Sequence, residues 1–487
     1  MSKTAVVIGA GIAGIACAIR LRAKGYEVKV IEANSYCGGK LSEFTHSGFR
    51  FDAGPSLFTM PQYVDELFLL LNENPREHFN YIKLKESCHY FYEDGTQFVA
   101  PSDSNEFAQL ISEKLKENKT TILKFLDKSK SLFQITAPVF LYKSLHKLST
   151  YLSKDGLYGI ANLWQLNMFT SMNAHNQRVF NHDKTVQFFN RFATYNGSNP
   201  YQAPATLNII PHLEFGFGTY FPNKGMVNIT NALVELAKRH GVEFILNQRV
   251  DKIHTDNNKV IGVQIGDETI KADKIVCNMD VFHAYKKLLP DYDMPQKVKN
   301  VESSSSALIF YWGIKKQFKE LGLHNVLFSQ NYKKEFDAIF KENTIDDDPT
   351  LYINITSKYK SDDAIVGGEN WFLMINAPAN KGQNWPELIV EARKNIINKI
   401  NRMLKTDIEP YIVFEETLTP EKIELKTSSY RGALYGSSSN NKMAAFFRHA
   451  NFHTGIKNLY FCGGSVHPGG GIPLCLLSAK IVSELCD

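Results

Sequence analysis

The opening of the chain carries the pattern that most restricts its fold. An apolar run at residues 3–8 leads into the glycine turn Gly9-Ala-Gly11-Ile-Ala-Gly14, and an alanine-rich stretch follows at 15–24. A second apolar run at 27–31 ends at the acid Glu32. This order predicts a buried strand, a tight turn, a helix and a second parallel strand, which is the opening unit of a dinucleotide-binding domain.

Each part of this unit has a mechanical purpose in holding a dinucleotide. Gly9 permits the tight turn, Gly11 lets the backbone touch a pyrophosphate, and Gly14 lets the helix pack closely on the strand. The helix N-terminus offers unpaired N–H groups to phosphates, and an acid after the second strand favours the unphosphorylated ribose of FAD or NAD over NADP. The cofactor contacts predicted here are Gly9, Gly11, Ile12, Ala13, Gly14, Glu32 and Ala33.

Two more turns of small residues follow soon after Glu32. The first, Gly38-Gly39-Lys40, supplies a flexible loop and a cation that can cover a pyrophosphate from the other side. The second is Gly54-Pro55-Ser56. We therefore add Gly39, Lys40, Gly54, Pro55 and Ser56 to the predicted cofactor contacts.

The end of the chain agrees independently. An apolar run at 458–461 ends in a glycine turn that contains Gly463 and Gly464. A helix is predicted to follow at 474–485, after Gly471-Ile472-Pro473. Proline in the first turn of a helix loses no useful hydrogen bond, and the helix N-terminus directs partial positive charge at a ligand. Gly463, Gly464, Gly471, Ile472 and Pro473 complete this set of contacts.

These motifs, in this order, resemble those of the flavin amine oxidase and phytoene desaturase superfamily. Residues 217–226 and 430–436, together with His-Pro-Gly-x-Gly-Ile-Pro at 467–473, are similar to elements of its bacterial carotenoid branch. One departure is Lys224, which stands where a second glycine is usual. The stretch 303–313 is most similar to flavobacterial hydroxycarotenoid 3,4-desaturases, and the resemblance covers essentially the whole chain.

The resemblance implies an α/β fold, in which a Rossmann-type FAD-binding domain carries an inserted α+β substrate domain and a helical lid able to contact a membrane. The FAD domain is expected at 1–75, 225–300 and 410–487. The substrate domain is expected at 76–224 and 301–409, with a helical segment at 120–170. The resemblance also places Val250, in an expected strand at 244–253, near the adenine, and Asp280 at the border of the flavin.

The activity that the resemblance implies is carotenoid desaturation. FAD would accept a hydride from an allylic C–H group, a neighbouring proton would be lost, and a new C=C bond would form, most closely in a hydroxylated or monocyclic carotene. Oxygen or a membrane quinone is the expected electron acceptor. A second GxGxxG unit for NAD is lacking, which argues against dependence on NADPH as a reductant. No carboxylate pair or Ser-His-Asp set marks a catalytic residue, and His467 is open between proton transfer and packing or backbone bonding.

Several alternatives stay open at this level. Phytoene desaturation and carotenoid cis–trans isomerisation fit the same motifs, and an amine oxidase suits the first forty residues equally well. The segments at 217–226 and 430–473 weigh against the amine oxidase. A non-enzymatic protein that carries FAD as a structural prop is a further alternative, since a fold alone does not fix a function.

Composition excludes other classes. A net charge of +5 over 487 residues gives no electrostatic reason to expect nucleic acid. The seven cysteines include no CxxC spacing, so neither a metal site nor a disulfide framework is expected. The first strand leaves no room for a signal peptide, and a cytoplasmic protein, dissolved or lying on the membrane, is expected. Apolar clusters alternate with lysines at 125–170, which suits either an amphipathic membrane-contacting helix or a lid packed on its own domain.

Overall fold

The computed structural model describes residues 3–441 and 444–486. A five-stranded parallel sheet gathers strands from both ends of the chain in the order β19-β13-β1-β2-β9. Its strands are β1 (Thr4–Ile8), β2 (Glu27–Ile31), β9 (Glu243–Ile245), β13 (Lys274–Cys277) and β19 (Leu459–Phe461). The strand, turn, helix and strand predicted for the opening of the chain are present, and the helix begins at Ile12.

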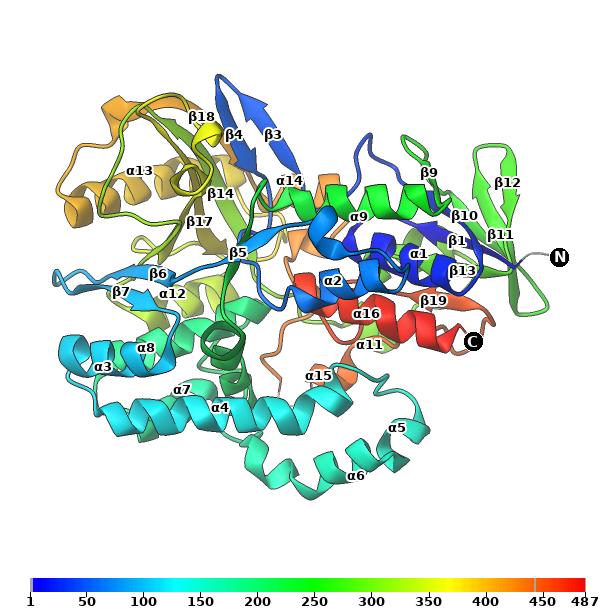
Figure 1. Ribbon diagram of the computed structural model, residues 1–487, viewed down its shortest axis with the longest axis horizontal. Helices are drawn as coiled ribbons and strands as arrows, with labels where there is room; N and C mark the ends of the chain where they lie inside the picture. The colour runs from blue at the N-terminus through cyan, green and yellow to red at the C-terminus, as the bar shows by residue number, and fades with distance from the viewer. Residues whose placement is uncertain (1–2, 442–443, 487) are drawn as a thin grey trace.

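Helices cover one face of this sheet. The contacting pairs are α1 with α16 and α1 with α9, and Figure 1 shows these helices and α2 side by side over β1 and β13. Ten residues of α1 are buried. Its alanines and Gly14 take up little space, which lets the helix lie close to the neighbouring helices. The helices are α1 (Ile12–Ala23), α2 (Gln62–Leu69), α9 (Val227–Arg239) and α16 (Ile472–Leu485).

The other face carries a three-stranded antiparallel sheet and short helices. These elements are β10 (Lys252–Asp256), β11 (Lys259–Ile265), β12 (Glu268–Lys271), α10 (Val281–His283) and α11 (Gln296–Lys299). The strand expected at 244–253 was wrong as one element, because the chain leaves β9 at Ile245 and enters β10 in a different sheet at Lys252. Asn247 has a positive φ of 57°, which turns the chain between the two strands and leaves Val250 outside both.

A seven-stranded sheet forms the second part of the molecule, in the order β18-β14-β17-β16-β15-β6-β7. Its strands are β6 (Glu86–Phe91), β7 (Gln97–Pro101), β14 (Ser306–Ile314), β15 (His324–Leu327), β16 (Leu351–Ile355), β17 (Glu369–Ala377) and β18 (Ile412–Leu418). Residues 412–418 were expected in the FAD domain, but they pair antiparallel with β14 and belong to this sheet. Alternate residues of β14 face opposite sides, and both sides are buried.

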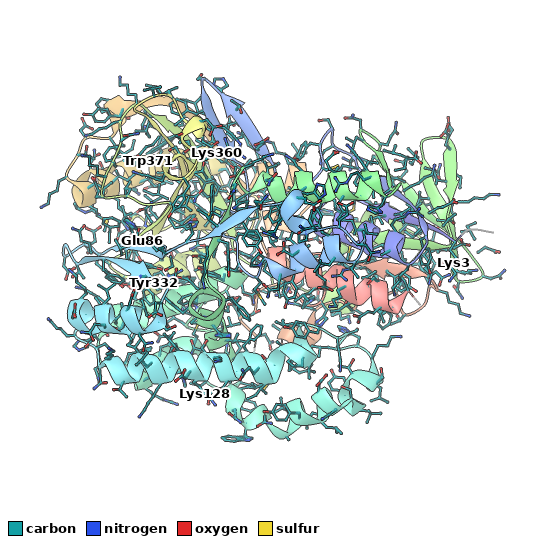
Figure 2. All side chains as sticks on the ribbon, viewed as in Figure 1. Lys3, Glu86, Lys128, Tyr332, Lys360 and Trp371 are labelled. Carbon is teal, nitrogen blue, oxygen red and sulfur yellow. The ribbon has the colours of Figure 1, made fainter. Side chains whose placement is uncertain are left out.

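The helix α13 (Trp385–Leu404) packs on one side of this sheet, around the buried rings of Trp312, Trp371 and Trp385. Figure 2 places Trp371 inside this part of the molecule, whereas Lys3 lies at the opposite end. Other elements of the described chain are β3 (Glu43–His46), β4 (Phe49–Asp52), β5 (Tyr81–Lys83), β8 (Tyr220–Pro222), α12 (Tyr332–Asp337), α14 (Pro420–Thr427) and α15 (Ala444–Phe447).

A helical layer packs below the seven-stranded sheet in Figure 1. Its helices are α3 (Ser104–Leu115), α4 (Lys119–Phe140), α5 (Leu148–Leu152), α6 (Lys154–Ala161), α7 (Met172–Val179) and α8 (Asp183–Asn190). The helical segment expected at 120–170 therefore comprises several helices. The apolar side of α4 is buried against its own domain, as the lid alternative expected, whereas α5 and α6 lie at the outer margin.

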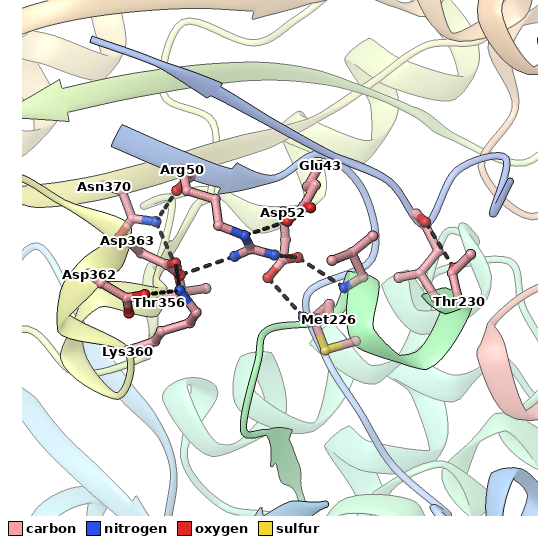
Figure 3. A network of polar contacts seen from close by, with 12 residues as sticks. Glu43, Arg50, Asp52, Met226, Thr230, Thr356, Lys360, Asp362, Asp363 and Asn370 are labelled. Carbon is pink, nitrogen blue, oxygen red and sulfur yellow. Dashed lines mark hydrogen bonds and ion pairs between the residues drawn. The ribbon is translucent and has the colours of Figure 1, made fainter. Parts of the chain in front are cut away.

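A buried network of charges joins the two sheets (Figure 3). Arg50, on β4, donates to Asp52 at 2.8 Å and to Asp363 at 3.1 Å. Asp52 accepts from the backbone N–H groups of Met226 (2.9 Å) and Val227 (3.1 Å), which begin α9. The network therefore ties the β3–β4 hairpin to a helix of the parallel sheet and, through Asp363, to a loop of the seven-stranded sheet.

Candidate active site

One cavity of about 1100 Å³ is lined from both sheets. It exceeds the roughly 300–1,000 Å³ of ordinary small-molecule sites. Every cofactor contact that the sequence predicted lines this cavity except Gly14. Segments far apart in the chain are thus brought to one place, namely the turns at Gly9–Ala13, Glu32–Ala33, Gly39–Lys40, Gly54–Ser56, Val250, Asp280, Gly463–Gly464 and Gly471–Pro473.

Gly14 has a packing function behind the cavity wall. A Cβ atom at this position would lie 2.1 Å from the carbonyl oxygen of Gly9, which is far inside contact distance. The N–H of Gly14 donates to Oδ1 of Asn278 at 3.1 Å, and Nδ2 of Asn278 donates to the carbonyl of Cys462 at 3.0 Å. Asn278 thereby links the turns after β1, β13 and β19, and it is a residue that the sequence-based list of contacts omitted.

Glu32 is buried and fixed in place by three hydrogen bonds. Its Oε2 accepts from the N–H of Ala10 at 2.7 Å, and its Oε1 accepts from the N–H and the side-chain amide of Asn34, each at 2.8 Å. The carboxylate therefore lies across the turn that precedes α1. It lines the cavity, so its remaining acceptor capacity can reach ribose hydroxyl groups.

The N-termini of two long helices reach the cavity. Gly11 precedes α1 and Gly471 precedes α16, and neither N-cap glycine has a side chain to bond the first N–H groups, although Asn278 accepts from Gly14 in the first turn of α1. Unpaired N–H groups at such ends favour an anion or a carbonyl oxygen. Gly471 has φ of 107°, and a Cβ atom there would meet no described atom within 4 Å, which leaves a cradle open to a flat ligand.

Lys40 is held at the same wall by backbone carbonyls. Its Nζ donates to Ala433 at 3.0 Å and to Leu434 at 2.9 Å, and burial lowers the pKa of this amine to about 8. Gly54 passes so close that a Cβ atom would lie 1.7 Å from the carbonyl oxygen of Lys40. Burial raises the pKa of the nearby Asp280, whose carboxylate accepts from the N–H of Phe282 at 3.0 Å.

Arg448 is a buried cation at this wall that the sequence did not predict. It donates to the carbonyls of Tyr435 (3.4 Å) and Ser437 (3.1 Å) and to Oδ1 of Asn196 (3.4 Å). Burial lowers the pKa of its guanidinium to about 10, and no described carboxylate pairs with it. The cavity wall therefore carries positive charge beside Gly469, where an added Cβ atom would lie 3.0 Å from Cζ of Arg448.

The rest of the cavity is mainly apolar and aromatic. Side chains from strands, including β14 and β17, and side chains from helices both line it. No local sequence signal identifies this set, because its members come from separate segments. They include Phe133, Leu141, Leu207, Ile209, Ile210, Leu213, Ile309, Tyr311, Val326, Phe372, Met374, Phe414 and Leu418. Such a chamber suits a long hydrophobic ligand.

A group of buried polar side chains interrupts this apolar wall. Arg191 donates to both carboxylate oxygens of Glu214, at 3.1 and 3.0 Å, and Tyr195 donates to Glu214 at 2.7 Å. A second set runs from Ser56 through Tyr352 to His324, with hydrogen bonds of 2.8 and 2.7 Å. All six residues line the cavity, and sequence reasoning had identified only Ser56.

The structure assigns His467 to backbone bonding. Its Nε2 lies 2.9 Å from the carbonyl oxygen of Lys143, and burial lowers the pKa of the imidazole to about 3. A neutral ring that donates to a carbonyl is poorly suited to proton transfer, and His467 is absent from the cavity wall. It ties the loop after α4 to the turn before α16.

Comparisons with known proteins agree with this geometry. The chain is 54% identical, over 99% of both chains, to a 1-hydroxycarotenoid 3,4-desaturase of Flavobacterium sp. (strain P99-3). It is 31% identical to a 4,4'-diapolycopene oxygenase of Methylomonas sp., over 99% of this chain and 98% of that protein.

Solved structures show the same fold at low identity. Putrescine oxidase bound to putrescine matches with a TM-score of 0.63 at 15% identity, over 100% of this chain and 98% of that one. An oxidoreductase of Methanosarcina mazei matches with a TM-score of 0.62 at 15% identity, over 99% and 100% of the two chains. The sequence model of the flavin containing amine oxidoreductases matches residues 12–486, and the chain belongs to that family.

Proposed function

We propose that this chain is an FAD-dependent desaturase that introduces the 3,4 double bond of a 1-hydroxylated carotenoid. The observation that carries the proposal is the two-part cavity, whose glycine-turn end opens into an apolar chamber. The relative at 54% identity is a desaturase of this kind, and it aligns over the whole length. A polyene chain suits the chamber, whereas a small polar amine would leave most of this apolar wall in contact with water.

The residues at the glycine-turn end fit FAD. Glu32 would hold the ribose, the N-terminus of α1 the pyrophosphate, and the cradle at Gly471 the flavin ring. When bound, FAD supplies the two-electron acceptor that removal of hydrogen from a C–C single bond requires. The positive charge of Arg448 and the α16 N-terminus would favour negative charge on that ring.

The chain's own contribution to the reaction is positioning and exclusion of water. The aromatic and aliphatic walls of β14 and β17 would align the polyene beside the flavin, and a bound polyene that fills the chamber would exclude water. The catalytic residue is unassigned. Loss of an allylic proton beside a delocalised cation needs only a weak proton acceptor. Oxygen or a membrane quinone would accept the electrons at the end of the reaction.

For domain organisation, we propose a discontinuous FAD domain at 1–75, 225–300 and 410–487, from which 412–418 is excluded. The remaining segments, at 76–224 and 301–409, together with β18, would form the substrate domain. This division is supported by the two sheets, because the five parallel strands all fall in the first set and the strands of the larger sheet fall in the second.

We also propose that α5, α6 and the turn after them contact a membrane surface. Trp164 is 78% exposed and Phe169 is 82% exposed. The other exposed apolar side chains of this surface are Leu148, Leu152, Leu157, Tyr158, Ile160 and Leu163. An apolar surface of this kind is typical of interfacial binding, and the exposed Lys147 and Lys154, at the starts of α5 and α6, would meet anionic head groups. No helix in the described part of the chain is both long and apolar enough to cross a membrane.

Vesicle binding tests the membrane surface. The double variant Trp164→Ser/Phe169→Ser is expected to lose at least about tenfold in affinity for vesicles with anionic lipid, since each buried side chain contributes roughly 1.5–3 kcal/mol. The control Val366→Ser/Val390→Ser changes exposed apolar residues elsewhere and should bind as the unchanged protein does. Equal binding by all three proteins would contradict the proposal.

Pigment analysis tests the activity. Bacteria that make a 1-hydroxylated carotenoid would express the chain, and the product would be analysed by liquid chromatography and mass spectrometry. A product two hydrogens lighter is expected. The control Gly471→Val, which fills the cradle, should give none. An isomer of unchanged mass, or unchanged pigment, would contradict desaturation.

A further inference from the structure

The polar end of the chamber contains a histidine whose outer nitrogen lacks a described partner. His324 lies on β15, is 4% exposed and lines the cavity. Its Nε2 is buried and has no hydrogen-bond partner among the described residues. A buried polar atom in this state costs free energy unless a ligand or water satisfies it.

The hydrogen bonds at the inner nitrogen fix which nitrogen carries the proton. The side-chain amide of Asn354 donates to the carbonyl of Leu323 at 3.0 Å, which identifies that amide atom as nitrogen. The same nitrogen lies 3.2 Å from Nδ1 of His324, and the hydroxyl of Tyr352 lies 2.7 Å from Nδ1. Because an amide nitrogen only donates, Nδ1 is the acceptor and the proton resides on Nε2.

The ring is neutral at physiological pH, since burial lowers the pKa of His324 to about 4. His324 therefore offers one N–H donor from Nε2. The carboxylate of Glu214 lines the same cavity as His324, and Arg191 and Tyr195 hold it in place. Among charged groups, Glu214 has the largest effect on the pKa of His324. Donor and acceptor together match a hydroxyl group, which accepts one hydrogen bond and donates another.

We infer that His324 and Glu214 form a subsite for the tertiary hydroxyl group of the carotenoid. His324 Nε2–H would donate to the hydroxyl oxygen, and Glu214 would accept the hydroxyl hydrogen. This inference rests on the proposed function and adds the part of the chain that selects the substrate. A purely apolar chamber would discriminate weakly between an alcohol and a hydrocarbon, whereas a site with buried polar partners rejects the analogue that lacks them.

The position of the subsite agrees with the position of the new double bond. Two hydrogen bonds, of 2.7 and 2.8 Å, lead from His324 through Tyr352 to Ser56. Ser56 belongs to the turn at 54–56, which is among the predicted cofactor contacts and lines the same cavity. In a 1-hydroxylated carotenoid the hydroxyl carbon is separated by one carbon from the 3,4 bond. A hydroxyl held near this turn would therefore place the reacting carbons close to the cofactor end of the cavity.

The test compares two carotenoids that differ only in the hydroxyl group. The purified FAD-loaded enzyme, in vesicles, would be assayed for kcat/KM on the 1-hydroxylated carotenoid and on its 1-deoxy analogue. The unchanged enzyme is expected to prefer the hydroxylated substrate by about 100-fold or more. His324→Phe should reduce this preference to within about threefold, since the donor is lost, and His324→Gln, which keeps an N–H donor, should retain most of it.

A matched control separates the subsite from general packing. His449 is another buried histidine, bonded to Tyr285 at 3.1 Å and absent from the wall of the large cavity. His449→Phe should leave the preference unchanged. Flavin content and melting temperature identify any variant that fails to fold. In that case the ratio of the two kcat/KM values of the unchanged enzyme, for the hydroxylated and the deoxy carotenoid, still tests the subsite.

The outcomes separate the two proposals. If the enzyme desaturates neither carotenoid, the proposed function is wrong. If it desaturates both with equal kcat/KM, desaturation holds and the hydroxyl subsite is wrong. The subsite is also wrong if His324→Phe lowers both values of kcat/KM by the same factor.

Discussion

The two ends of the cavity are built in opposite ways. The cofactor end is built mainly from backbone, namely the turns at 11–13, 38–39, 463–464 and 470–473 and the N-termini of two helices, with Glu32, Lys40 and Arg448 as its charged side chains. The substrate end consists of side chains, among them His324 and Glu214, which converge from separate elements. At a backbone-built end, a side chain added at a glycine such as Gly14 collides with neighbouring backbone. At a side-chain-built end, one contact can be altered at a time.

The largest expected effect follows from closing the backbone-built end. In Gly14→Val, the new side chain collides with the carbonyl of Gly9, and α1 cannot stay against β1. We expect purified Gly14→Val to carry no FAD, measured by absorbance after gel filtration. In Gly455→Ala, the added carbon meets only His453, at 3.5 Å, so this control should retain full flavin. Normal flavin content in Gly14→Val would show that the turn has more freedom than its geometry implies.

The second prediction breaks the side-chain-built end. Arg191→Met leaves the Glu214 carboxylate buried without its cation, which should lower the free energy of unfolding by about 3–5 kcal/mol. Arg191→Met/Glu214→Met should recover most of this loss, because an apolar pair needs no compensation. The measurement is urea denaturation of each variant.

An exposed ion pair provides the control for this cycle. Lys29 and Glu243 lie 3.0 Å apart with side chains 46% and 55% exposed. Lys29→Met should therefore change the free energy of unfolding by no more than about 1 kcal/mol. Equal losses for Lys29→Met and Arg191→Met would show that burial does not govern the cost of breaking the Arg191–Glu214 pair.

The third prediction weakens one contact at the cofactor end. Glu32→Gln keeps the shape of the side chain but removes its charge, and hydrogen bonds to charged groups contribute roughly 1.5–3 kcal/mol. The dissociation constant of FAD, measured by fluorescence titration of the apoprotein, should rise about 10–100-fold. Glu27→Gln, at the exposed start of the same strand, should bind FAD normally. An unchanged constant in Glu32→Gln would remove this carboxylate from the cofactor site.

The same contrast explains how much the sequence could predict. The cofactor end was predictable because each turn is a local motif, so Gly11, Glu32 and Gly471 could be identified without knowing the fold. Arg191, Glu214 and His324 carry no local signature, because their proximity depends on how distant elements pack. Residues 412–418 were misplaced for the same reason, since strand pairing with β14 is a long-range property.

The smallest expected effect concerns pH and compares histidines at the two ends. Burial lowers the pKa of His324 to about 4 and that of His467 to about 3, below the value near 6.5 of an unfolded chain. The unfolded chain therefore binds more protons as pH falls below 6.5, so the stabilisation present above that pH is progressively lost. At pH 5.5 each histidine should cost about 1.4 kcal/mol relative to pH 7.5.

Urea denaturation at pH 7.5 and 5.5 checks this, with His324→Gln and His467→Gln each expected to lose about 1.4 kcal/mol less stability than the unchanged protein over that range. Nε2 of His324 keeps its proton when Nδ1 is protonated, so a saturating 1-hydroxylated carotenoid should stabilise the unchanged protein and His467→Gln at both pH values. In His324→Phe this stabilisation should be smaller at both pH values, because the donor is lost. Equal stabilisation of His324→Phe and His467→Gln by the carotenoid would place His324 with His467, as a residue that packs the fold and does not contact the substrate.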